Sequence, residues 1–428
     1  MARVPASEAT RKRLNDMLSG TSGVERSALM REAVRLIVEE TLEAEVTDAL
    51  GRGYYDRAAN DGRGQRNGYR SGRLDSAEGR IEYAVPQVRG IDGWRSEVRA
   101  SLGGKSEELE RLAIEMYARG LSMRDIEAAF TDERGCSVLS RSAASRVAER
   151  LWDDYQAFAN RSLADLTIVY LFVDGVAERL HLGQPREAVL AAWGIDESGA
   201  KHLLGLLPGT KEDTACCRDF LRDLKARGLA DPIAAITDGA PGLIRAAEEV
   251  LPRSIRQRCL AHKMRNLQSK VPEERCREVL PAARAAYQAP SAALARLAAE
   301  EFAKRWQHEL PAAVRCFEDD FEACIAHLRL PIAHRRVTRT TNLLERLFGE
   351  ERRRTKVIPH AFGERAVMKL MYASLMRASQ TWRGVIITEF ERKQLDTLRD
   401  ELNAQFEQLH ATPLKPASRS RIYSKDGT

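Results

Sequence analysis

The stretches IVYLFVDG (residues 168–175) and IAAITDG (residues 233–239) decide the fold class of this chain. Each is an apolar run of strand-forming residues that ends in Asp-Gly. Further strands are expected over residues 188–195 and 202–207, and a helix over 214–228. Consecutive strands followed by alternating helix and strand predict a mixed α/β sheet with helices packed on it.

Three acidic residues are candidates for chemistry. Asp174 and Asp238 end the two predicted strands, and Glu345 lies in the helix-like stretch TNLLERLF (residues 341–348). Singly, each aspartate fits an Asp-Gly turn and the glutamate a surface ion pair. In an α/β sheet, however, ligands gather at strand ends, and glycine leaves room for a phosphate. Carboxylates brought together there would suit a hard divalent cation and phosphodiester chemistry.

Basic residues crowd around Glu345. Residues 334–356 contain eight positive charges against three negative ones, a local net charge of +5 in a chain whose formal net charge is +6. Such a basic face would hold a phosphate backbone beside the acid that holds the cation. The candidate DNA-contacting residues here are Arg335, Arg336, Arg339, Arg346, Arg352, Arg353 and Arg354.

The composition indicates a soluble globular protein. The 428 residues leave room for two or three domains, and 43% are hydrophobic and 30% charged. Seven irregularly spaced cysteines favour a reduced compartment. The N-terminus lacks the apolar core of a signal peptide, and no apolar run approaches the roughly 20 residues that span a bilayer. We therefore expect a cytoplasmic protein.

The first 160 residues suggest DNA binding. Residues 8–50 have helical periodicity, whereas residues 51–80 are rich in Gly, Asn and Arg and predict an irregular segment, either a solvated linker or a DNA-contacting arm. A short strand is expected over residues 80–85, stopped by Pro86. Three helices should follow, beginning at Ser106, at Ser122 and near Leu139.

The last of these helices carries Arg141 and Arg146 on its outer face. The arrangement fits a helix-turn-helix, although three helices can also pack together without contacting DNA.

Residues 256–335 predict helices only, over 257–270, 273–286, 292–306 and 311–327. Near their start, Cys259 and His262 could form half of a zinc site, but no paired second half follows. The favoured interpretation is that both pack near the active site, with His262 also able to assist proton transfer. Lys263, Arg265 and Asn266 would then face nucleic acid. Trp306 is expected in the core of these helices.

These patterns divide the chain into six parts. Residues 1–104 form a helical and basic DNA-binding region, 105–160 the helix-turn-helix and 165–255 the first part of the catalytic domain. An all-helical insertion follows over 256–335. The second part of the catalytic domain covers 336–400, and a basic tail covers 401–428.

Short motifs spread over residues 25–385 have a combined pattern that is more specific than any one of them. They are RNGYR (66–70, with Arg66, Asn67 and Arg70), YARGLS (117–122), VDG (173–175), LKARGL (224–229), TDG (237–239), QRC (257–259) with RNL (265–267), and TTN (340–342) with Glu345. Together they resemble bacterial insertion-sequence transposases of the Mutator-like class, whose catalytic domain is RNase H-like and of the DDE type.

The resemblance implies that Asp174, Asp238 and Glu345 form a DDE triad that binds two Mg²⁺ (or Mn²⁺) ions. It also implies that Cys259 and His262 are the family's Cys-x₂-His motif. The apolar residues around Glu345 differ from the small or polar run that is more usual in the family.

The expected activity is nicking at terminal inverted repeats followed by strand transfer into target DNA, by at least a homodimer in the bacterial cytosol at the nucleoid. Two alternatives remain at this point: an inactive sequence-specific DNA-binding protein that keeps the fold, and an RNase H-like nuclease.

Overall fold

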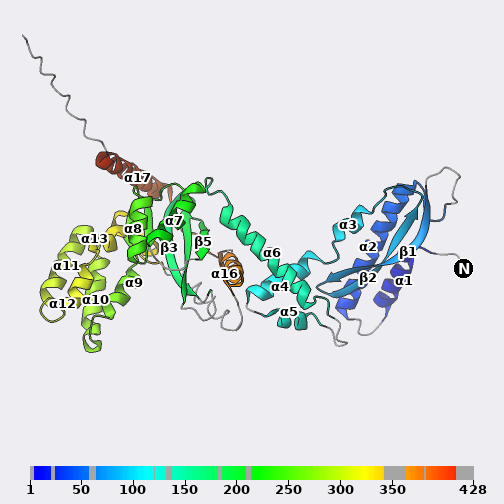
Figure 1. The fold of residues 1–428 in the computed structure, drawn as a ribbon, viewed down its shortest axis with the longest axis horizontal. Coiled ribbons are helices and arrows are strands. Elements are labelled where there is room, and N and C mark those ends of the chain that lie inside the picture. Colours follow the sequence, from blue (N-terminus) through cyan, green and yellow to red (C-terminus); the bar gives the residue numbers. More distant parts are fainter. Residues whose placement is uncertain are drawn as a thin grey trace, which may run out of the picture. The chain divides into compact units, whose positions relative to one another are not determined.

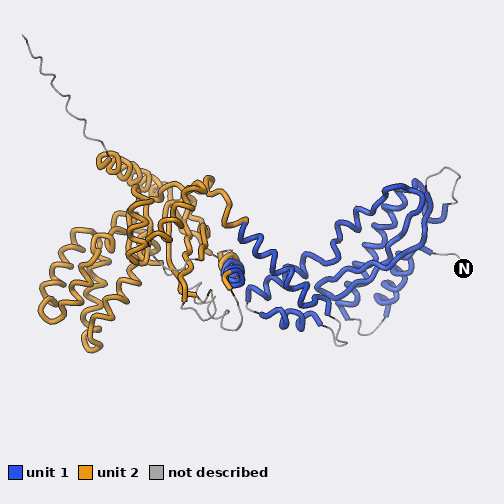
Figure 2. Tube along the Cα trace, in the orientation of Figure 1, with its two compact units in different colours: residues 1–156, 351–361, 365–374 blue, residues 157–350, 362–364, 375–428 orange. Residues whose placement is uncertain are grey.

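The computed structural model describes residues 4–20, 25–56, 64–119, 121–131, 137–178, 180, 186–208, 214–341, 363–379 and 382–410 (Figure 1). They form two compact units (Figure 2). Unit 1 holds the described residues up to Gln156 together with Arg365–Ser374. Unit 2 holds those from Ala157 to Thr341, Gly363 and Glu364, and those from Leu375 onwards. Within the described ranges, no helix has the length and apolar character needed to cross a membrane.

Unit 1 begins with two helices and a β-hairpin. Helices α1 (Ala6–Ser19) and α2 (Arg26–Leu50) confirm the predicted helical region, and strands β1 (Gln65–Ser76) and β2 (Gly79–Arg89) pair antiparallel. One face of the hairpin packs on α2 through a shared apolar core, made of Val38, Leu42, Leu74, Ile81, Tyr83 and Val85. The burial of this face holds the hairpin on the helix.

Two predictions about the hairpin are wrong. Much of the segment predicted to be irregular is strand β1, and β2 continues through Pro86 instead of stopping there. Gly72, which resembled a turn residue, leaves space for an aromatic ring, because a Cβ atom there would lie 2.5 Å from the Tyr83 ring. Pro86 pairs with Tyr69 beside an irregularity in the register, a position where strands tolerate proline.

Four helices follow in unit 1: α3 (Glu97–Leu102), α4 (Glu107–Ala118), α5 (Met123–Ala129) and α6 (Arg141–Asn160), the last of which crosses the boundary between units. Ser106 caps α4 by accepting from the amide of Leu109, and Ser122 forms a capping box with Asp125 on α5. The predicted helix starts are therefore confirmed. Part of α16 (Glu364–Ser379) belongs to the same unit, where Lys369 pairs with Glu149 of α6 at 2.6 Å.

Unit 2 is built on a five-stranded mixed sheet with the order β5-β4-β3-β6-β7. The strands are β3 (Ile168–Glu178), β4 (Glu187–Asp196), β5 (Lys201–Pro208), β6 (Ala234–Thr237) and β7 (Ile255–Arg258). The first three are antiparallel neighbours, and β6 and β7 run parallel to β3. Helices α7 (Thr214–Ala226) and α8 (Pro241–Val250) pack on one face, sharing a core with Leu171, Val173 and Ala235. This confirms the predicted mixed α/β class.

Two details of the sheet differ from the prediction. β3 continues past Asp174 for four residues because β4 pairs with it as far as Glu178. β7 lies in a stretch where only helices were expected; it is four residues long, too short for its alternation to be distinguished from a helix start.

Helices follow β7: α9 (Leu260–Gln268), α10 (Cys276–Tyr287), α11 (Ala292–Trp306), α12 (Pro311–Glu318), α13 (Phe321–Ile325) and α14 (Arg335–Thr338), with short 3₁₀ turns at Glu273–Arg275, Ala326–Arg329 and Ile332–His334. Trp306 is 3% exposed within their core, as predicted. Helix α17 (Glu389–His410) includes the first ten residues of the predicted tail, and the rest of that tail lies outside the described residues.

Candidate active site

The sheet brings Asp174 and Asp238 to the same level. β3 and β6 are parallel, and their last paired positions are Val173 and Thr237, so each aspartate is the next residue along its chain. Adjacent strands lie about 4.8 Å apart. Because Val173 faces the core under α7 and α8, the alternation of a strand directs Asp174 to the opposite face. Of the three predicted acids, these two are therefore neighbours at the carboxyl end of β6.

Asp174 is held almost out of solvent. Its side chain is buried, with 3% exposure, and its Oδ1 accepts a hydrogen bond from the amide of Gly175 at 3.0 Å. On the same face of β3, Phe172 stacks on Trp193 of β4, with ring centroids 3.9 Å apart.

Asp238 is more open and is fixed by a turn. Its Oδ1 accepts from the amide of Ala240 at 2.9 Å, which places the carboxylate just before helix α8. Gly239 between them has φ +90°, and a Cβ atom there would lie 2.5 Å from Nε of Arg258. The glycine is thus required both by the backbone and by the arginine packed against it. The Asp238-Gly239 dipeptide forms the turn that was the alternative prediction for it. The same turn presents a carboxylate at the strand end.

Glu345 and the rest of the stretch after Thr341 in which a helix is expected lie outside the described residues, but the chain leading to Glu345 is anchored at the strand ends. The amide of Cys259 donates to the carbonyl of Thr237 at 2.7 Å. Thr341 is buried, and its amide and hydroxyl donate to Sγ of Cys259 at 3.3 and 3.4 Å. The amide of Leu260 also donates to the carbonyl of Arg339 at 2.8 Å. Thr341, four residues before Glu345, is therefore bonded to Cys259, and Cys259 is bonded to Thr237, the residue before Asp238.

Cys259 is the centre of this anchor. Burial alone would raise the pKa of its thiol, but hydrogen bonds from His262 and Thr341 outweigh burial and hold the pKa below its ordinary value. Cys259 and His262 hydrogen-bond to each other, and Cys259 lies beside Thr237, the residue before Asp238. Within the described part of the chain, no group of three or more His, Cys, Asp or Glu side chains is placed to hold a metal ion.

The prediction that Lys263 faces nucleic acid is wrong. Its side chain is fully buried, and its ammonium group donates to the carbonyl of Asp319 and lies 3.6 Å from that residue's carboxylate. Arg258 pairs with the same carboxylate at 2.8 Å. A buried cation needs an acidic partner, and this one comes from a turn more than fifty residues later. Burial lowers the pKa of Lys263.

The other predicted DNA-contacting residues differ in how far they are exposed and in what they contact. Arg335 donates to three backbone carbonyls, and Arg66 donates to two carbonyls and to the hydroxyl of Thr47, so both guanidinium groups hold the fold together. Arg339 is half-buried. The exposed ones are Asn67, Arg70, Arg141, Arg146, Arg265, Asn266 and Arg336. Arg346, Arg352, Arg353 and Arg354 lie outside the described residues.

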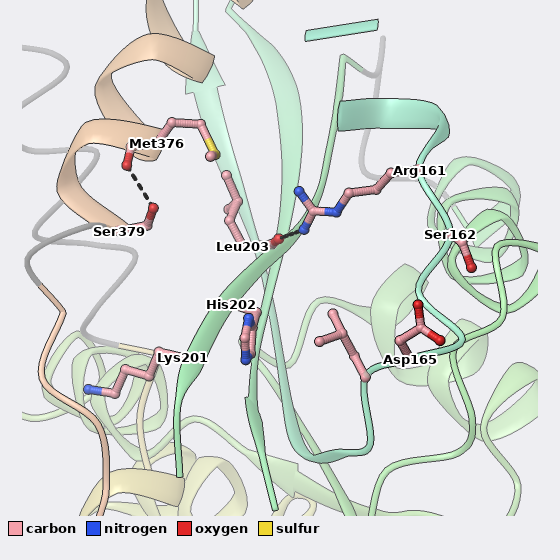
Figure 3. A pocket seen from close by; sticks show the side chains of 9 residues that line it. Arg161, Ser162, Asp165, Lys201, His202, Leu203, Met376 and Ser379 are labelled. Carbon is pink, nitrogen blue, oxygen red and sulfur yellow. Dashed lines mark hydrogen bonds between the residues drawn. The ribbon is translucent and has the colours of Figure 1, made fainter. Parts of the chain in front are cut away.

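Sequence reasoning missed two features of unit 2. Tyr170, on the same face of β3 as Asp174, hydrogen-bonds through its hydroxyl to Nδ1 of His334 at 2.7 Å, with both side chains buried. A pocket of about 390 Å³ also lies beside the edge strand β5, where Arg161 donates to the carbonyl of Leu203 and His202 faces the pocket (Figure 3). Its lining includes neither Asp174 nor Asp238. Nothing in the sequence pattern marks either feature.

The comparisons with known proteins agree on one class. The profile of the family described as "Transposase, Mutator family" matches residues 8–384. The transposase for insertion sequence element ISRM5 of Rhizobium meliloti (strain 1021) is 31% identical over 82% of this chain and 88% of the relative. The transposase for insertion sequence element IS406 of Burkholderia multivorans is 32% identical over 82% of this chain and 90% of the relative.

A solved structure, the Drosophila P element transposase strand transfer complex, aligns with 71% of this chain and 83% of that chain. At 12% identity and a TM-score of 0.28, the likeness is too low to support an argument.

The α/β unit with its two neighbouring carboxylates thus lies in a chain that matches the family profile over most of its length. The chain is a transposase. It belongs to the Mutator family of transposases, and its relatives named here are transposases of bacterial insertion sequences.

Proposed function

We propose that this protein is a DDE-type transposase of an insertion sequence, which binds terminal inverted repeats, cleaves a strand at the element end and joins it to target DNA. The observation that carries the proposal is the pairing of Val173 with Thr237, which makes Asp174 and Asp238 neighbours. The strand order, three antiparallel strands followed by two parallel ones, fits an RNase H-like catalytic domain. The anchor at Thr341 supports the choice of Glu345 as the third acid, since it lies four residues along the chain and four residues span at most about 14 Å.

The donor set suits the ions that this chemistry needs. Asp174 and Asp238 offer carboxylate oxygens, and Glu345 would add a third carboxylate, which is the ligand type that Mg²⁺ and Mn²⁺ prefer. Two such ions would activate the attacking oxygen and stabilise the leaving oxygen. The protein's own part is orientation, because the amides of Gly175 and Ala240 fix both aspartates before substrate binds.

DNA recognition is assigned to unit 1. Helices α4, α5 and α6 would form the helix-turn-helix, and Arg141 and Arg146 of α6 are exposed to solvent. The connection between α4 and α5 is short, whereas the chain between α5 and α6 is longer and covers residues 130–140. Because transposition joins two element ends to one target, the active species is at least a dimer on DNA.

The test is cleavage of a labelled DNA duplex that carries the element end, with Mg²⁺ and with EDTA. Wild-type protein should nick the end and form joined products only with the metal ion. Asp174→Asn, Asp238→Asn and Glu345→Gln should each lower cleavage by at least about a thousandfold and leave end binding within about twofold, because they remove ligands and not DNA contacts. Asp219→Asn, an exposed aspartate on α7, is the matched control and should cleave normally.

The outcomes separate the alternatives. Wild-type cleavage by any triad variant would overturn the triad. Specific end binding with no metal-dependent nicking by the wild type would indicate a DNA-binding protein that keeps the fold. Nicking without any joined product, together with cleavage of RNA in a hybrid, would indicate an RNase H-like nuclease.

A further inference from the structure

A second pocket of unit 2 has a strongly basic lining. It encloses about 330 Å³ between α9, α10 and the segment that follows α14. Arg265, Arg284 and Arg339 come from these three places, and Gln268 and Gln288 lie beside them. None of the ten described residues that line it is acidic; the other five are Leu260, Ala261, Met264, Leu280 and Thr340.

Arg339 of this pocket is prepared for an anion. Nη1 of Arg339 donates to Oε1 of Gln288 at 2.9 Å, which holds the half-buried guanidinium at the pocket wall. Burial, and then the nearby charge of Arg336, lower the pKa of Arg339. A cation partly removed from water beside another cation is destabilised, and an anion in the pocket would reverse that cost.

The pocket adjoins the candidate active site through its own lining residues. Leu260 follows Cys259 directly, and Thr340 precedes Thr341, so two wall residues are each one position from the anchor. The amide of Cys259 is in turn bonded to Thr237, the residue before Asp238. The pocket therefore lies beyond the carboxyl ends of β6 and β7, where ligands of such sheets bind.

We propose that this pocket binds an internucleotide phosphate of the DNA strand close to the phosphate that is cut. The inference rests on the proposed function and adds a specific contact to it. Guanidinium groups match a phosphate through paired N–H donors, and the two glutamine amides can supply further donors. The apolar wall of Leu260, Met264 and Leu280 can accommodate the sugar carbons on either side of the phosphate.

The first experiment measures binding of the full-length protein to the duplex element end in EDTA, over a series of salt concentrations. Arg284→Gln with Arg265→Gln should weaken binding about tenfold, less than the loss of two independent contacts, because both arginines act on one phosphate that Arg339 still binds. It should also reduce the slope of log K against log salt by about one unit. Arg315→Gln, an exposed arginine on α12 outside the pocket, is the matched control and should change neither. Thermal melting checks that the variants fold.

The second experiment locates the phosphate. Single neutral methylphosphonates are placed at each position within about ten nucleotides of the cut. At one position the methylphosphonate should weaken binding by the wild type but not weaken binding by the double variant any further, as expected when the phosphate and the arginines form one contact. At the other positions that matter, the methylphosphonate and the double variant should weaken binding additively. Unchanged affinity and salt slope in the double variant, or additive losses at every position, would overturn the proposal.

A last arm distinguishes the source of the phosphate. If millimolar inorganic phosphate raises the melting temperature of the wild type but not of Arg284→Gln, while both bind DNA equally, the pocket takes a free phosphate and the proposal is wrong. These readouts need no cleavage, so they remain informative if metal-dependent nicking is absent. If the proposed function is wrong but the phosphate contact is real, the wild type will not nick the DNA, yet one methylphosphonate position will still cause no further loss of binding in the double variant.

Discussion

Gly239 connects the carboxylate of Asp238 to the packing of the strand end. With φ +90° it adopts a backbone conformation that costs a side-chain-bearing residue about 1–2 kcal/mol. Its Cα atom also faces Arg258, whose guanidinium is held by Asp319 at 2.8 Å. The turn that presents Asp238 therefore depends on a residue with no chemistry of its own.

Gly239→Ala should reduce cleavage more than it reduces stability. The added methyl group would collide with Arg258, so the turn must shift and carry Asp238 with it, and small displacements of catalytic groups can cost about a hundredfold in rate. Gly363→Ala is the matched control: its φ is also +90°, but no atom lies within 4 Å of the added methyl group. Single-turnover cleavage and thermal unfolding of both variants test this. Equal effects on cleavage would show that backbone strain alone is responsible.

The role of a single residue can be predicted from the sequence when that role depends on residues nearby in the chain. Asp238 at a strand end and Trp306 in the core were placed correctly because periodicity and strand ends are local signals, whereas β3 continues past Asp174 through its pairing with β4. Lys263 was misplaced because its partner, Asp319, comes from a turn 56 residues away. Arg66 is a similar case, since Thr47 and two carbonyls before it on the chain take up a guanidinium that had been expected to contact DNA.

Between elements, Cys259 and Thr341 act as a clamp that joins β7 to the segment before Glu345. Thr341 is fully buried, so its two hydrogen bonds to the Cys259 sulfur are shielded from water. Cys259 thereby holds Thr341, four residues before Glu345, beside the end of β7, which makes a positioning role for Cys259 testable.

Thr341→Ala should therefore slow cleavage by about tenfold or more while costing about 1 kcal/mol of unfolding free energy, the usual net worth of one hydrogen bond. The matched control is Thr338→Ala, in which an equally buried threonine loses its hydrogen bond to the carbonyl of His334 at 3.0 Å. It should lose similar stability but keep its cleavage rate. Urea unfolding and single-turnover cleavage measure the two quantities, and parallel loss of rate in both variants would refute a positioning role.

Elements were predictable where they are long and periodic. Ala292–Trp306 was predicted at its observed bounds, whereas β7 is short and the hairpin is rich in residues typical of turns. The hairpin forms because α2 supplies the apolar surface on which its inner face packs, and that surface is distant in sequence. Tertiary burial thus overrides the local turn composition.

For the whole molecule, the two units imply that DNA recognition and strand cleavage can be separated by mutation. Arg141→Gln with Arg146→Gln removes two exposed charges from α6 in unit 1, and should weaken binding of the element end by about a hundredfold, the cost of two charge-assisted hydrogen bonds. Because Asp174 and Asp238 belong to unit 2, metal-dependent cleavage should return toward the wild-type rate at saturating protein concentration. Arg111→Gln with Arg119→Gln makes the same charge change at exposed arginines paired with Glu108 and Glu115, and should bind normally. The measurements are binding titrations, followed by cleavage assays at saturating protein. Normal binding by the α6 variant would remove this helix from DNA recognition. A cleavage defect that persists at saturation would mean that α6 also contributes to the chemistry.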